Sequence, residues 1–211
     1  MGHREDLLAG AKRCLLERGY GRTTARDIVA ASGTNLASIG YHFGSKEALL
    51  DAALAGAIEE WADRLGSALR SARLPAKDPV ARFEALWTRV IDAFDHHRPL
   101  WVATFEALAQ AERSPEVRRF VAELMQRGRE RLAQALHDGD ATADDASRAR
   151  TVGALQQALM LGVMAQWLVD PERAPTAREL ATGLRASAGA PGQTRPRAST
   201  ARQAKRRPRK R

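Results

Sequence analysis

Cysteine is almost absent from this chain of 211 residues, since Cys14 is the only one. A single cysteine cannot form an intramolecular disulfide bond, which excludes the disulfide-rich secreted class and fits a reducing cytosol. Cys14 falls on the apolar face of a helix expected over residues 5–18, with Leu7, Leu8, Ala11 and Leu15. We therefore expect a buried structural thiol at this position, and not a redox sensor.

Long apolar runs are also missing. The first residues, MGHREDLLAGAKR, hold no apolar region of the length that a secretory signal needs. The longest stretch without a polar residue, Ala158–Ala165, is far shorter than the ~20 residues that span a bilayer. We therefore expect a soluble, cytoplasmic protein with no membrane partner.

Motifs for catalysis and for metal or cofactor binding are missing as well. The sequence holds no glycine-rich phosphate loop, no zinc-ligand spacing and no pairing of a nucleophile with a base. His96 and His97 are adjacent, but neighbouring residues of a helix point about 100° apart, so they suit a helix end better than a metal ion. We predict no enzyme activity, no cofactor and no metal site.

Strand-like alternation of apolar and polar residues is not found anywhere in the sequence, and neither is an internal repeat. Amphipathic helical patterns, separated by glycine and proline, fill most of the chain. We therefore predict an all-α fold, with helices over residues 5–18, 24–32, 35–43, 46–69, 79–98, 100–111, 115–137, 142–169 and 176–186.

A capped helix and a glycine turn begin the most informative segment, residues 23–50. Thr24 followed by Asp27 forms a capping-box pattern, with Asp in place of the usual Glu or Gln. The helix continues to about Ser32. Gly33 ends it, because glycine readily adopts the left-handed conformation that such a turn needs.

A second, very short helix follows directly. Asn35 can cap it through its side-chain oxygen, Gly44 ends it, and Ser45 caps the helix after it. Two helices with this tight turn form the local pattern of a helix-turn-helix, which places its second helix in the DNA major groove. An unrelated helical protein could carry the same caps, but the aromatic end at residues 41–43 and the small, polar outer face favour DNA binding.

The residues RGY at 18–20 and YHFGSKEALL at 41–50 resemble the TetR family of bacterial transcriptional repressors. The resemblance covers roughly the first fifty residues closely, and beyond them only the all-helical layout agrees. It implies a dimeric regulator with an N-terminal helix-turn-helix and a helical half that binds an effector. Two residues depart from the family pattern, since Val29 stands where Ala is common and Thr34 where an apolar residue is common.

DNA contacts are expected around the turn. Thr24 and Lys46, each at a helix start, are candidates for phosphate contacts, and Tyr41 and His42 match the backbone-clamping pair that the resemblance implies. In the alternative reading, Thr24 only caps a helix, Asn35 does the same, and His42 only packs against Phe43. The candidates for base contacts, beside the turn glycine Gly33, are Thr34, Asn35, Ala37, Ser38 and Gly40.

The apolar spacing of the short helix predicts its orientation. Leu36, Ile39 and Phe43 are expected to face inward, which leaves Ala37, Ser38, Gly40, Tyr41 and His42 facing outward or sideways. Because residues 36–43 contain no Arg or Lys, one copy should bind DNA weakly. Two copies in a dimer would then be needed, and they would read a palindromic operator in double-stranded DNA.

The chain is expected to divide into three parts. Residues 1–46 form a helix-turn-helix DNA-binding domain, residues 47–186 form a helical effector-binding and dimerisation domain, and residues 187–211 form a disordered basic tail. The helix that starts at Ser45 bridges the first two parts, so movement of one can tilt the other. Nine of the 34 basic residues and none of the 25 acidic ones lie in the tail, so the excess charge of +9 belongs to it.

The helix over residues 142–169 is the best candidate for a homodimer interface. Its apolar band is wider than one packing seam needs, and its small residues permit close helix approach. The family resemblance favours a four-helix interface that also uses residues 176–186, and the alternative is a central helix of a monomeric core. The predicted interface residues are Val152, Leu155, Leu159, Gly162, Val163 and Trp167.

The helical half is also expected to hold an unknown small-molecule effector in an apolar pocket with a few polar anchors. A plain hydrophobic core explains most of the same residues equally well. The predicted pocket residues are Trp87, Phe94, Trp101, Phe105, Glu106, Met125, Gln156, Met160 and Met164.

These features favour a dimeric transcriptional repressor that an effector releases from its operator by shifting the helical half. An alternative from another class is a nucleoid-type protein driven by the basic tail. It predicts sequence-indifferent DNA binding that is lost when residues 187–211 are deleted. A small-molecule enzyme is a distant third reading, which measured turnover would revive.

Overall fold

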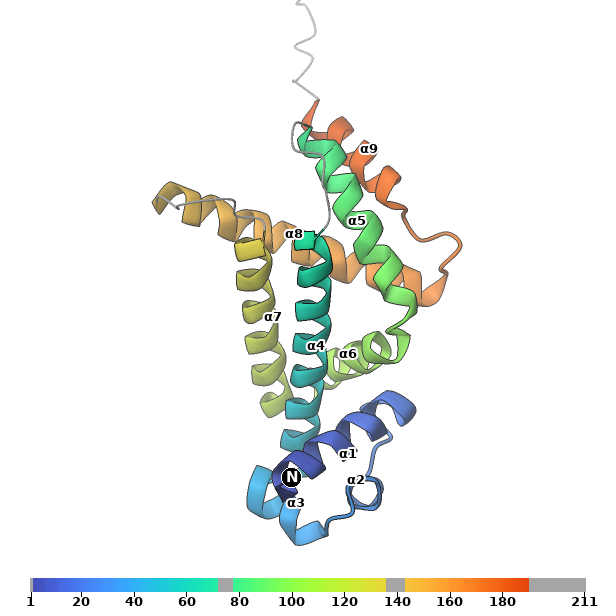
Figure 1. The fold of residues 1–211 in the computed structure, drawn as a ribbon, viewed down its shortest axis with the longest axis vertical. Helices are drawn as coiled ribbons and strands as arrows, with labels where there is room; N and C mark the ends of the chain where they lie inside the picture. Colours follow the sequence, from blue (N-terminus) through green and yellow to red (C-terminus); the bar gives the residue numbers. More distant parts are fainter. Residues whose placement is uncertain (1, 72–77, 136–142, 190–211) are drawn as a thin grey trace, which may run out of the picture.

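A computed structural model describes residues 2–71, 78–135 and 143–189 (Figure 1). The described residues form helices and no strand, which confirms the predicted all-α fold. The predicted helix signals at Gly139 and Thr142 and most of the predicted basic tail lie outside these ranges. The helices are α1 (His3–Arg18), α2 (Ala25–Ser32), α3 (Leu36–Phe43), α4 (Lys46–Ser71), α5 (Pro79–Asp95), α6 (Arg98–Gln110), α7 (Pro115–Ala135), α8 (Ala143–Val169) and α9 (Ala177–Ala188).

The caps that the sequence predicts are present around the turn between α2 and α3. The Thr24 hydroxyl accepts the Asp27 N–H at 3.2 Å, and the Asp27 carboxylate accepts the Thr24 N–H at 2.9 Å, which completes the capping box. Gly33 adopts the left-handed conformation, with φ 68° and ψ 21°. The Asn35 side chain accepts the Ser38 N–H at 3.0 Å and so begins α3. The predicted helix-turn-helix is therefore confirmed.

A shared apolar core joins α1, α2, α3 and the first part of α4. Cys14 is 3% exposed within it, and burial raises the pKa of its thiol. The prediction of a buried thiol is confirmed. We call residues 2–46 the reading unit. The buried residues around Cys14 include Leu7, Ala11, Leu15, Ile28, Ile39, Leu49 and Leu50.

The helices from α4 to α9 form a bundle, with the reading unit at one end of the molecule (Figure 1). α4 leaves the reading unit and runs beside α7, and two ion pairs join these helices, Arg127 to Glu59 at 3.7 Å and Arg131 to Asp63 at 3.2 Å. α8 crosses behind the far ends of α4 and α7, and α9 packs along α5. α4 thus begins at the edge of the reading unit, packs its first turns into the core of that unit, and continues through the bundle.

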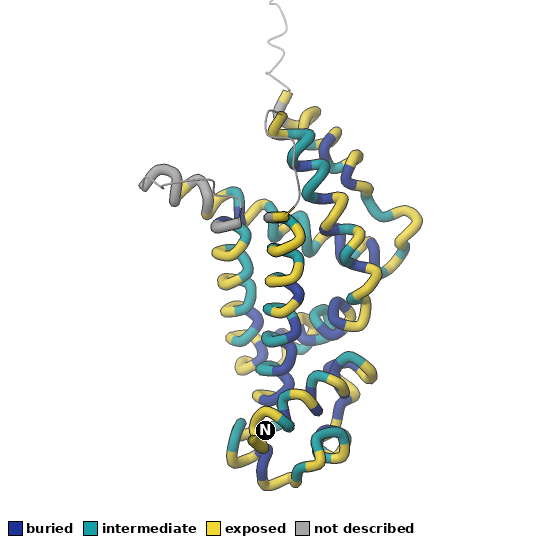
Figure 2. Tube along the Cα trace, viewed as in Figure 1, coloured by how far each residue is buried: buried dark blue, intermediate teal, exposed yellow. Residues whose placement is uncertain are grey.

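Four aromatic rings occupy the centre of the bundle. Trp61 of α4 meets Trp101 of α6 edge to face, with ring centroids 4.6 Å apart. Phe94 of α5 is fully buried, and its ring lies 5.9 Å from those of Trp101 and Trp167. Figure 2 shows buried segments where α4 approaches α6 and where α4 enters the reading unit. Aromatic packing therefore sets how α4, α5, α6 and α8 lie against one another.

Two helix ends differ from the prediction. α6 begins at Arg98 and carries Pro99 in its first turn, where the sequence predicts a break. Proline is tolerated there because the first N–H groups of a helix have no intrahelical partner. α9 continues to Ala188, past the predicted start of the tail at residue 187, and ends at Gly189.

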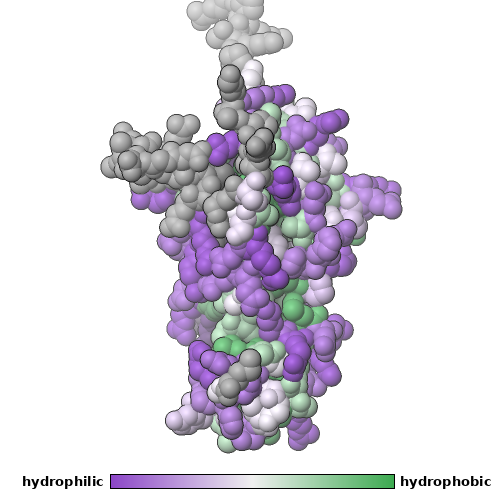
Figure 3. Space-filling model, in the orientation of Figure 1, coloured by the Kyte–Doolittle hydropathy of each residue, from purple (hydrophilic) through white to green (hydrophobic). Residues whose placement is uncertain are grey.

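α8 contains a candidate membrane span by length and composition alone, Arg150–Val169, with a mean hydropathy of 1.4. Sequence reasoning missed it because scattered glutamines interrupt every apolar run without lowering the average much. Gln156 accepts a hydrogen bond from Trp87 at 2.9 Å, and Gln157 donates to the Met125 carbonyl at 2.9 Å. These bonds tie α8 to α5 and α7 as part of the bundle. The molecular face in Figure 3 is largely hydrophilic.

Carboxylates at helix starts make the fold sensitive to acid. The Glu179 carboxylate accepts the Thr176 N–H at 2.9 Å, and this backbone bond, followed by one from the Thr176 hydroxyl, holds the pKa of Glu179 below its ordinary value of 4.5. The folded state therefore takes up this proton less readily than the unfolded state does. The stabilisation is present above pH 4.5 and is lost as the pH falls through the lower folded pKa.

We expect Glu179→Gln to lose less stability than the parent protein between about pH 5 and about pH 3, because the amide cannot titrate. Urea unfolding at both pH values measures this difference. Glu123→Gln, on an exposed site of α7, is the matched control and should follow the parent protein. An equal acid response of the parent, Glu179→Gln and Glu123→Gln would contradict the role of the α9 cap.

Candidate nucleic-acid interface and effector site

The outer face of α3 is open to solvent. Tyr41 is 86% exposed, and Ala37 and Gly40 are exposed beside it. The Tyr41 ring contacts the His42 ring edge to face, with centroids 4.8 Å apart. A helix of 8 residues with such a narrow and small outer face can enter a major groove and bring its side chains close to base edges.

α3 is rotated about its axis relative to the sequence prediction. Leu36, predicted to face inward, is 53% exposed. Ser38, predicted to face the groove, is buried, and its hydroxyl donates to Asn35 Oδ1 at 3.2 Å. Both predictions are wrong, because contacts with α1, α2 and α4 centre the buried arc on Ser38 and Ile39. Leu36 therefore joins the outer face together with Ala37, Gly40 and Tyr41. These residues have the spacing i, i+1, i+4 and i+5, which is typical of one side of a helix and could have indicated this face.

Residues at the turn and at the end of α3 are partly engaged within the protein. Thr34 is half-buried, and its hydroxyl lies 2.7 Å from that of Ser32. The Asn35 side chain caps α3, and His42 is half-buried between two neighbouring rings. The capping and packing contacts of the alternative reading therefore exist, and they hold the turn and the helix end next to the outer face.

Polar and cationic groups flank α3 at the starts of α2 and α4. The Lys46 ammonium donates to the Thr23 carbonyl at 3.3 Å and pairs with Glu47 at 3.3 Å, so its charge is partly compensated within the protein. Arg26, in the first turn of α2 beside Thr24, is exposed and has no polar partner in the described part of the chain. Sequence reasoning missed Arg26, although a cation beside a helix start was visible.

A loop at residues 19–24 connects the reading unit to two helices of the bundle. The Tyr20 hydroxyl donates to Asp51 of α4 at 2.6 Å, and burial raises the pKa of this phenol, so it stays protonated. The Glu106 carboxylate of α6 accepts the Gly21 N–H at 3.1 Å. Glu106 was predicted to line an effector pocket, and in the structure its carboxylate reaches this loop. Movement of α4 or α6 would therefore act directly on the reading unit.

Gly19 shows how closely α6 approaches this loop. Its φ of +88° disfavours any side chain, and a Cβ there would lie 2.6 Å from Glu106 Oε2. The backbone conformation therefore favours glycine at this position, whereas the Glu106 carboxylate, at the end of a flexible side chain, could shift to make room for a Cβ.

The other residues predicted to line an effector pocket form packed core. Trp87 is 2% exposed, and its indole N–H is bonded to Gln156 of α8. These side chains belong to the apolar core that several helices share, which fits the alternative of a plain core, and their place in an effector pocket stays a prediction. The remaining predicted residues are buried Phe94, Trp101 and Met164 and half-buried Phe105, Met125 and Met160.

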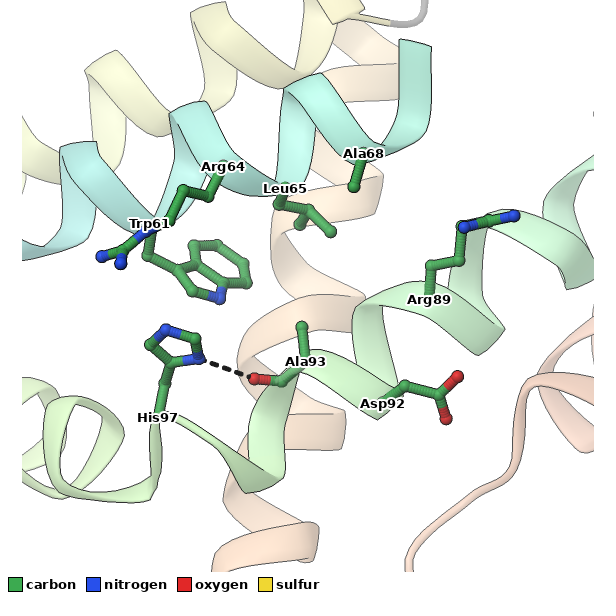
Figure 4. Close-up of a pocket in the computed structure, with 8 residues that line it drawn as sticks. All are labelled: Trp61, Arg64, Leu65, Ala68, Arg89, Asp92, Ala93 and His97. Carbon is green, nitrogen blue, oxygen red and sulfur yellow. Dashed lines mark hydrogen bonds between the residues drawn. The ribbon is translucent and has the colours of Figure 1, made fainter. Parts of the chain in front are cut away.

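A cavity of about 320 Å³ lies elsewhere, between α4 and α5 near the start of α6 (Figure 4). Its volume falls in the range of small-molecule sites, ~300–1,000 Å³. We call it the α4–α5 cavity. It is lined by apolar Trp61, Leu65, Ala68 and Ala93 and by polar Arg64, Arg89, Asp92 and His97.

α8 turns one face to the bundle and leaves the other uncovered. Val163 and Trp167 are 3% and 6% exposed, so their assignment to a dimer interface is wrong; they pack in the bundle core. Leu155 is 50% exposed, and Val152 and Leu159 are half-buried. An apolar stripe left open along a helix marks an interaction surface. We call it the α8 stripe; its exposed residues are Ala154, Leu155, Ala158, Gly162 and Gln166.

Histidines end α5, where the sequence places helix-end cations. His96 follows the last residue of α5, and the His97 ring bonds the Ala93 carbonyl through Nδ1 at 3.0 Å. Within the described ranges, no three His, Cys, Asp or Glu side chains gather as a metal site would need.

Two family profiles match the sequence. Residues 7–53 match the family described as bacterial regulatory proteins, tetR family. Residues 78–190 match the family described as tetracyclin repressor-like, C-terminal domain. The first match covers most of the reading unit, and the second covers the bundle from α5 onward.

Relatives and solved structures agree with these matches. The HTH-type transcriptional repressor KstR2 of Rhodococcus jostii is 36% identical over 94 residues, 44% of each chain, so the match spans less than half of that relative. The HTH-type transcriptional regulator BetI of Rhizobium meliloti is 32% identical over 146 residues, 69% of each chain. The multidrug binding protein EbrR, solved with imidazole, gives a TM-score of 0.64 at 23% identity over 87% of this chain and 95% of that one. The last likeness establishes the fold alone.

Proposed function

The chain belongs to the TetR family of bacterial regulatory proteins, and from this membership we propose that it is a transcriptional repressor. Two copies bind a palindromic operator, and a small-molecule effector bound in the bundle releases them. The observation that carries the proposal is the outer face of α3, exposed and small, beside a turn that Gly33 and the flanking caps fix.

The proposed base contacts come from the outer face of α3 and from the turn. Leu36 and Ala37 suit a thymine methyl, the Asn35 NH₂ group, whose partner oxygen caps α3, suits a base acceptor, and the Thr34 hydroxyl suits several bases. Gly40 lets the helix backbone approach the groove floor. Buried Ser38 no longer belongs to this group of residues.

The proposed phosphate contacts surround the groove. Tyr41 supplies an exposed hydroxyl at the end of α3, with His42 beside it. Thr24 and Lys46 offer donors at the starts of α2 and α4, and Arg26 adds an unpaired cation among the described residues. Such contacts set affinity and register, whereas the base contacts set sequence preference.

We propose that the α8 stripe pairs with the same stripe of a second copy across a two-fold axis, with α9 beside it. Its small residues allow the helices to approach closely, and Leu155 supplies apolar surface to bury. This pairing also accounts for the apolar composition of α8 without a membrane. A DNA-bound regulator of this kind acts in the cytoplasm.

We propose that the effector acts through α4. EbrR is described as a multidrug binding protein. In this chain, the α4–α5 cavity is the candidate site for such a ligand. A ligand that fits one position of α4 better than another shifts the population toward that position. The bonds of Tyr20 to Asp51 and of Gly21 to Glu106 would pass this shift to the reading unit and change the separation of the two α3 helices.

Selection of bound duplexes from a random DNA pool, at moderate salt, tests the proposed function. We expect one palindromic sequence whose half-sites lie about one helical turn, ~34 Å, apart. A variant that ends at residue 189 should enrich the same sequence, with lower affinity and a weaker dependence on salt. Enrichment of no sequence, or loss of all binding with the tail, would favour the nucleoid-type alternative.

A further inference from the structure

The start of α1 lies beside the end of α3 (Figure 1). The guanidinium carbon of Arg4 lies 5.2 Å from the ring centroid of Phe43, the last residue of α3. This distance is within the ~6 Å at which a cation and an aromatic face attract each other. The contact therefore holds the charge of Arg4 at the end of α3 that also carries exposed Tyr41.

The donors of the Arg4 side chain have no acceptor within the described part of the chain. Arg4 is exposed, and no hydrogen bond or ion pair joins it to a described residue. Glu5 and Asp6 follow it on α1, but successive residues of a helix point about 100° apart, so their carboxylates project in other directions. A planar guanidinium with five N–H groups suits the oxygens of a phosphate.

DNA binding by α3 needs cations from outside this helix, because residues 36–43 contain no Arg or Lys. Lys46, at the start of α4, pairs with Glu47 at 3.3 Å, so its charge is partly compensated. Arg4 has no such partner among the described residues. A helix in the major groove lies between two phosphate backbones, so a cation at its end suits a phosphate better than a base edge.

We propose that Arg4 binds a phosphate of the operator backbone at the C-terminal end of α3, next to the phosphate that Tyr41 contacts. The proposal rests on the proposed function, in which α3 enters the major groove. The Phe43 ring positions the guanidinium before DNA binds. Arg4 therefore adds affinity and helps to fix the register of α3, and it leaves sequence preference unchanged.

The salt dependence of operator binding by the full chain tests the proposal. Each lost phosphate contact reduces the slope of log K against log salt concentration by about 0.9, so Arg4→Gln should reduce it by about 1.8 in a dimer. Operator affinity should fall about tenfold, which corresponds to losing two exposed charge pairs. Arg4→Lys keeps the charge and should keep the slope. Arg119→Gln, on exposed α7, is the matched control and should change neither quantity.

Neutral methylphosphonate groups, placed one at a time along each half-site, locate the contacted phosphate. We expect one position at which the replacement weakens binding by the parent protein and has little further effect on Arg4→Gln, because both changes remove the same contact. Thermal unfolding of Arg4→Gln separates this role from a structural one, in which Arg4 only covers the Phe43 ring and its loss lowers stability alone.

An unchanged salt slope in Arg4→Gln, or methylphosphonate effects that are equal in the parent protein and Arg4→Gln at every position, would overturn the proposal. Sequence selectivity of the parent protein is measured separately, against an unrelated duplex. Selective binding with an unchanged slope in Arg4→Gln would overturn only the Arg4 contact. Equal affinity for the operator and the unrelated duplex, with a slope that still depends on Arg4, would overturn only the proposed function.

Discussion

Replacing Tyr41 with alanine is expected to lower operator affinity by about 100-fold or more while the fold stays intact. A hydrogen bond to a charged phosphate contributes about 1.5–3 kcal/mol, and the dimer loses it twice. Tyr41 is 86% exposed and touches the neighbouring His42 ring, so its removal takes nothing from the core. Fluorescence anisotropy with the selected operator, at one fixed salt concentration, measures the loss.

Two controls define what Tyr41 contributes. Tyr41→Phe keeps the ring and removes only the hydroxyl, so it separates phosphate bonding from stacking. Leu108→Ala truncates a side chain of α6 that is 37% exposed and lies outside the reading unit, and it should leave affinity unchanged. Wild-type affinity of Tyr41→Ala for the operator would show that α3 does not present its outer face to DNA.

The second large effect is expected at the α8 stripe, where Gly162→Arg should produce a monomer that no longer binds the operator. A Cβ at Gly162 meets no atom of the described residues within 4 Å, so one subunit accepts the change. In a symmetric pair, however, the substitution introduces a bulky cation twice into a close apolar contact. Sedimentation velocity should report half the parent mass, and operator affinity should fall at least about 100-fold because one reading unit must act alone.

Gly56→Arg is the matched control for this substitution. Gly56 is also a helical glycine with open space around its Cβ position, but it lies on α4, away from the α8 stripe. It should remain dimeric. A dimeric Gly162→Arg protein would contradict the proposed interface. Equal dissociation of Gly162→Arg and Gly56→Arg would show that an added arginine disrupts the dimer wherever it stands, and that the effect is not specific to the α8 stripe.

Features set by neighbouring residues could be predicted from the sequence. The capping box of Thr24 and Asp27, the left-handed turn at Gly33 and the Asn35 cap each depend on contacts within four residues. Glycine, asparagine and threonine at these positions restrict the backbone by their own chemistry. The helix-turn-helix therefore followed from about thirty residues, without knowledge of the rest of the chain.

Features set by packing between distant helices could not be predicted in this way. Helical spacing gives an apolar side but not its exact direction, and a rotation by part of one residue step exchanged Leu36 with Ser38 on α3. The same uncertainty on α8 placed Val163 and Trp167 at an interface, although both are buried in the bundle. The partner helix decides which edge of an apolar band becomes covered.

The cavity and the junction depend on residues that lie far apart in the sequence. Glu106 has the composition of a polar pocket anchor, yet it bonds Gly21, which lies 85 positions earlier in the chain. The α4–α5 cavity brings Trp61 next to Ala93 and His97 for the same reason. No local sequence pattern predicts these contacts, because they result from the way that α4, α5 and α6 cross.

The central claim is that two subunits insert their α3 helices into successive major grooves on one face of DNA. Binding to the selected palindrome, compared with the same palindrome carrying about five extra base pairs between its half-sites, tests this claim most directly. Half a turn of DNA moves one half-site to the opposite face of the duplex, so affinity should fall to that of unrelated DNA. Equal affinity for the original and the lengthened palindrome would contradict the claim.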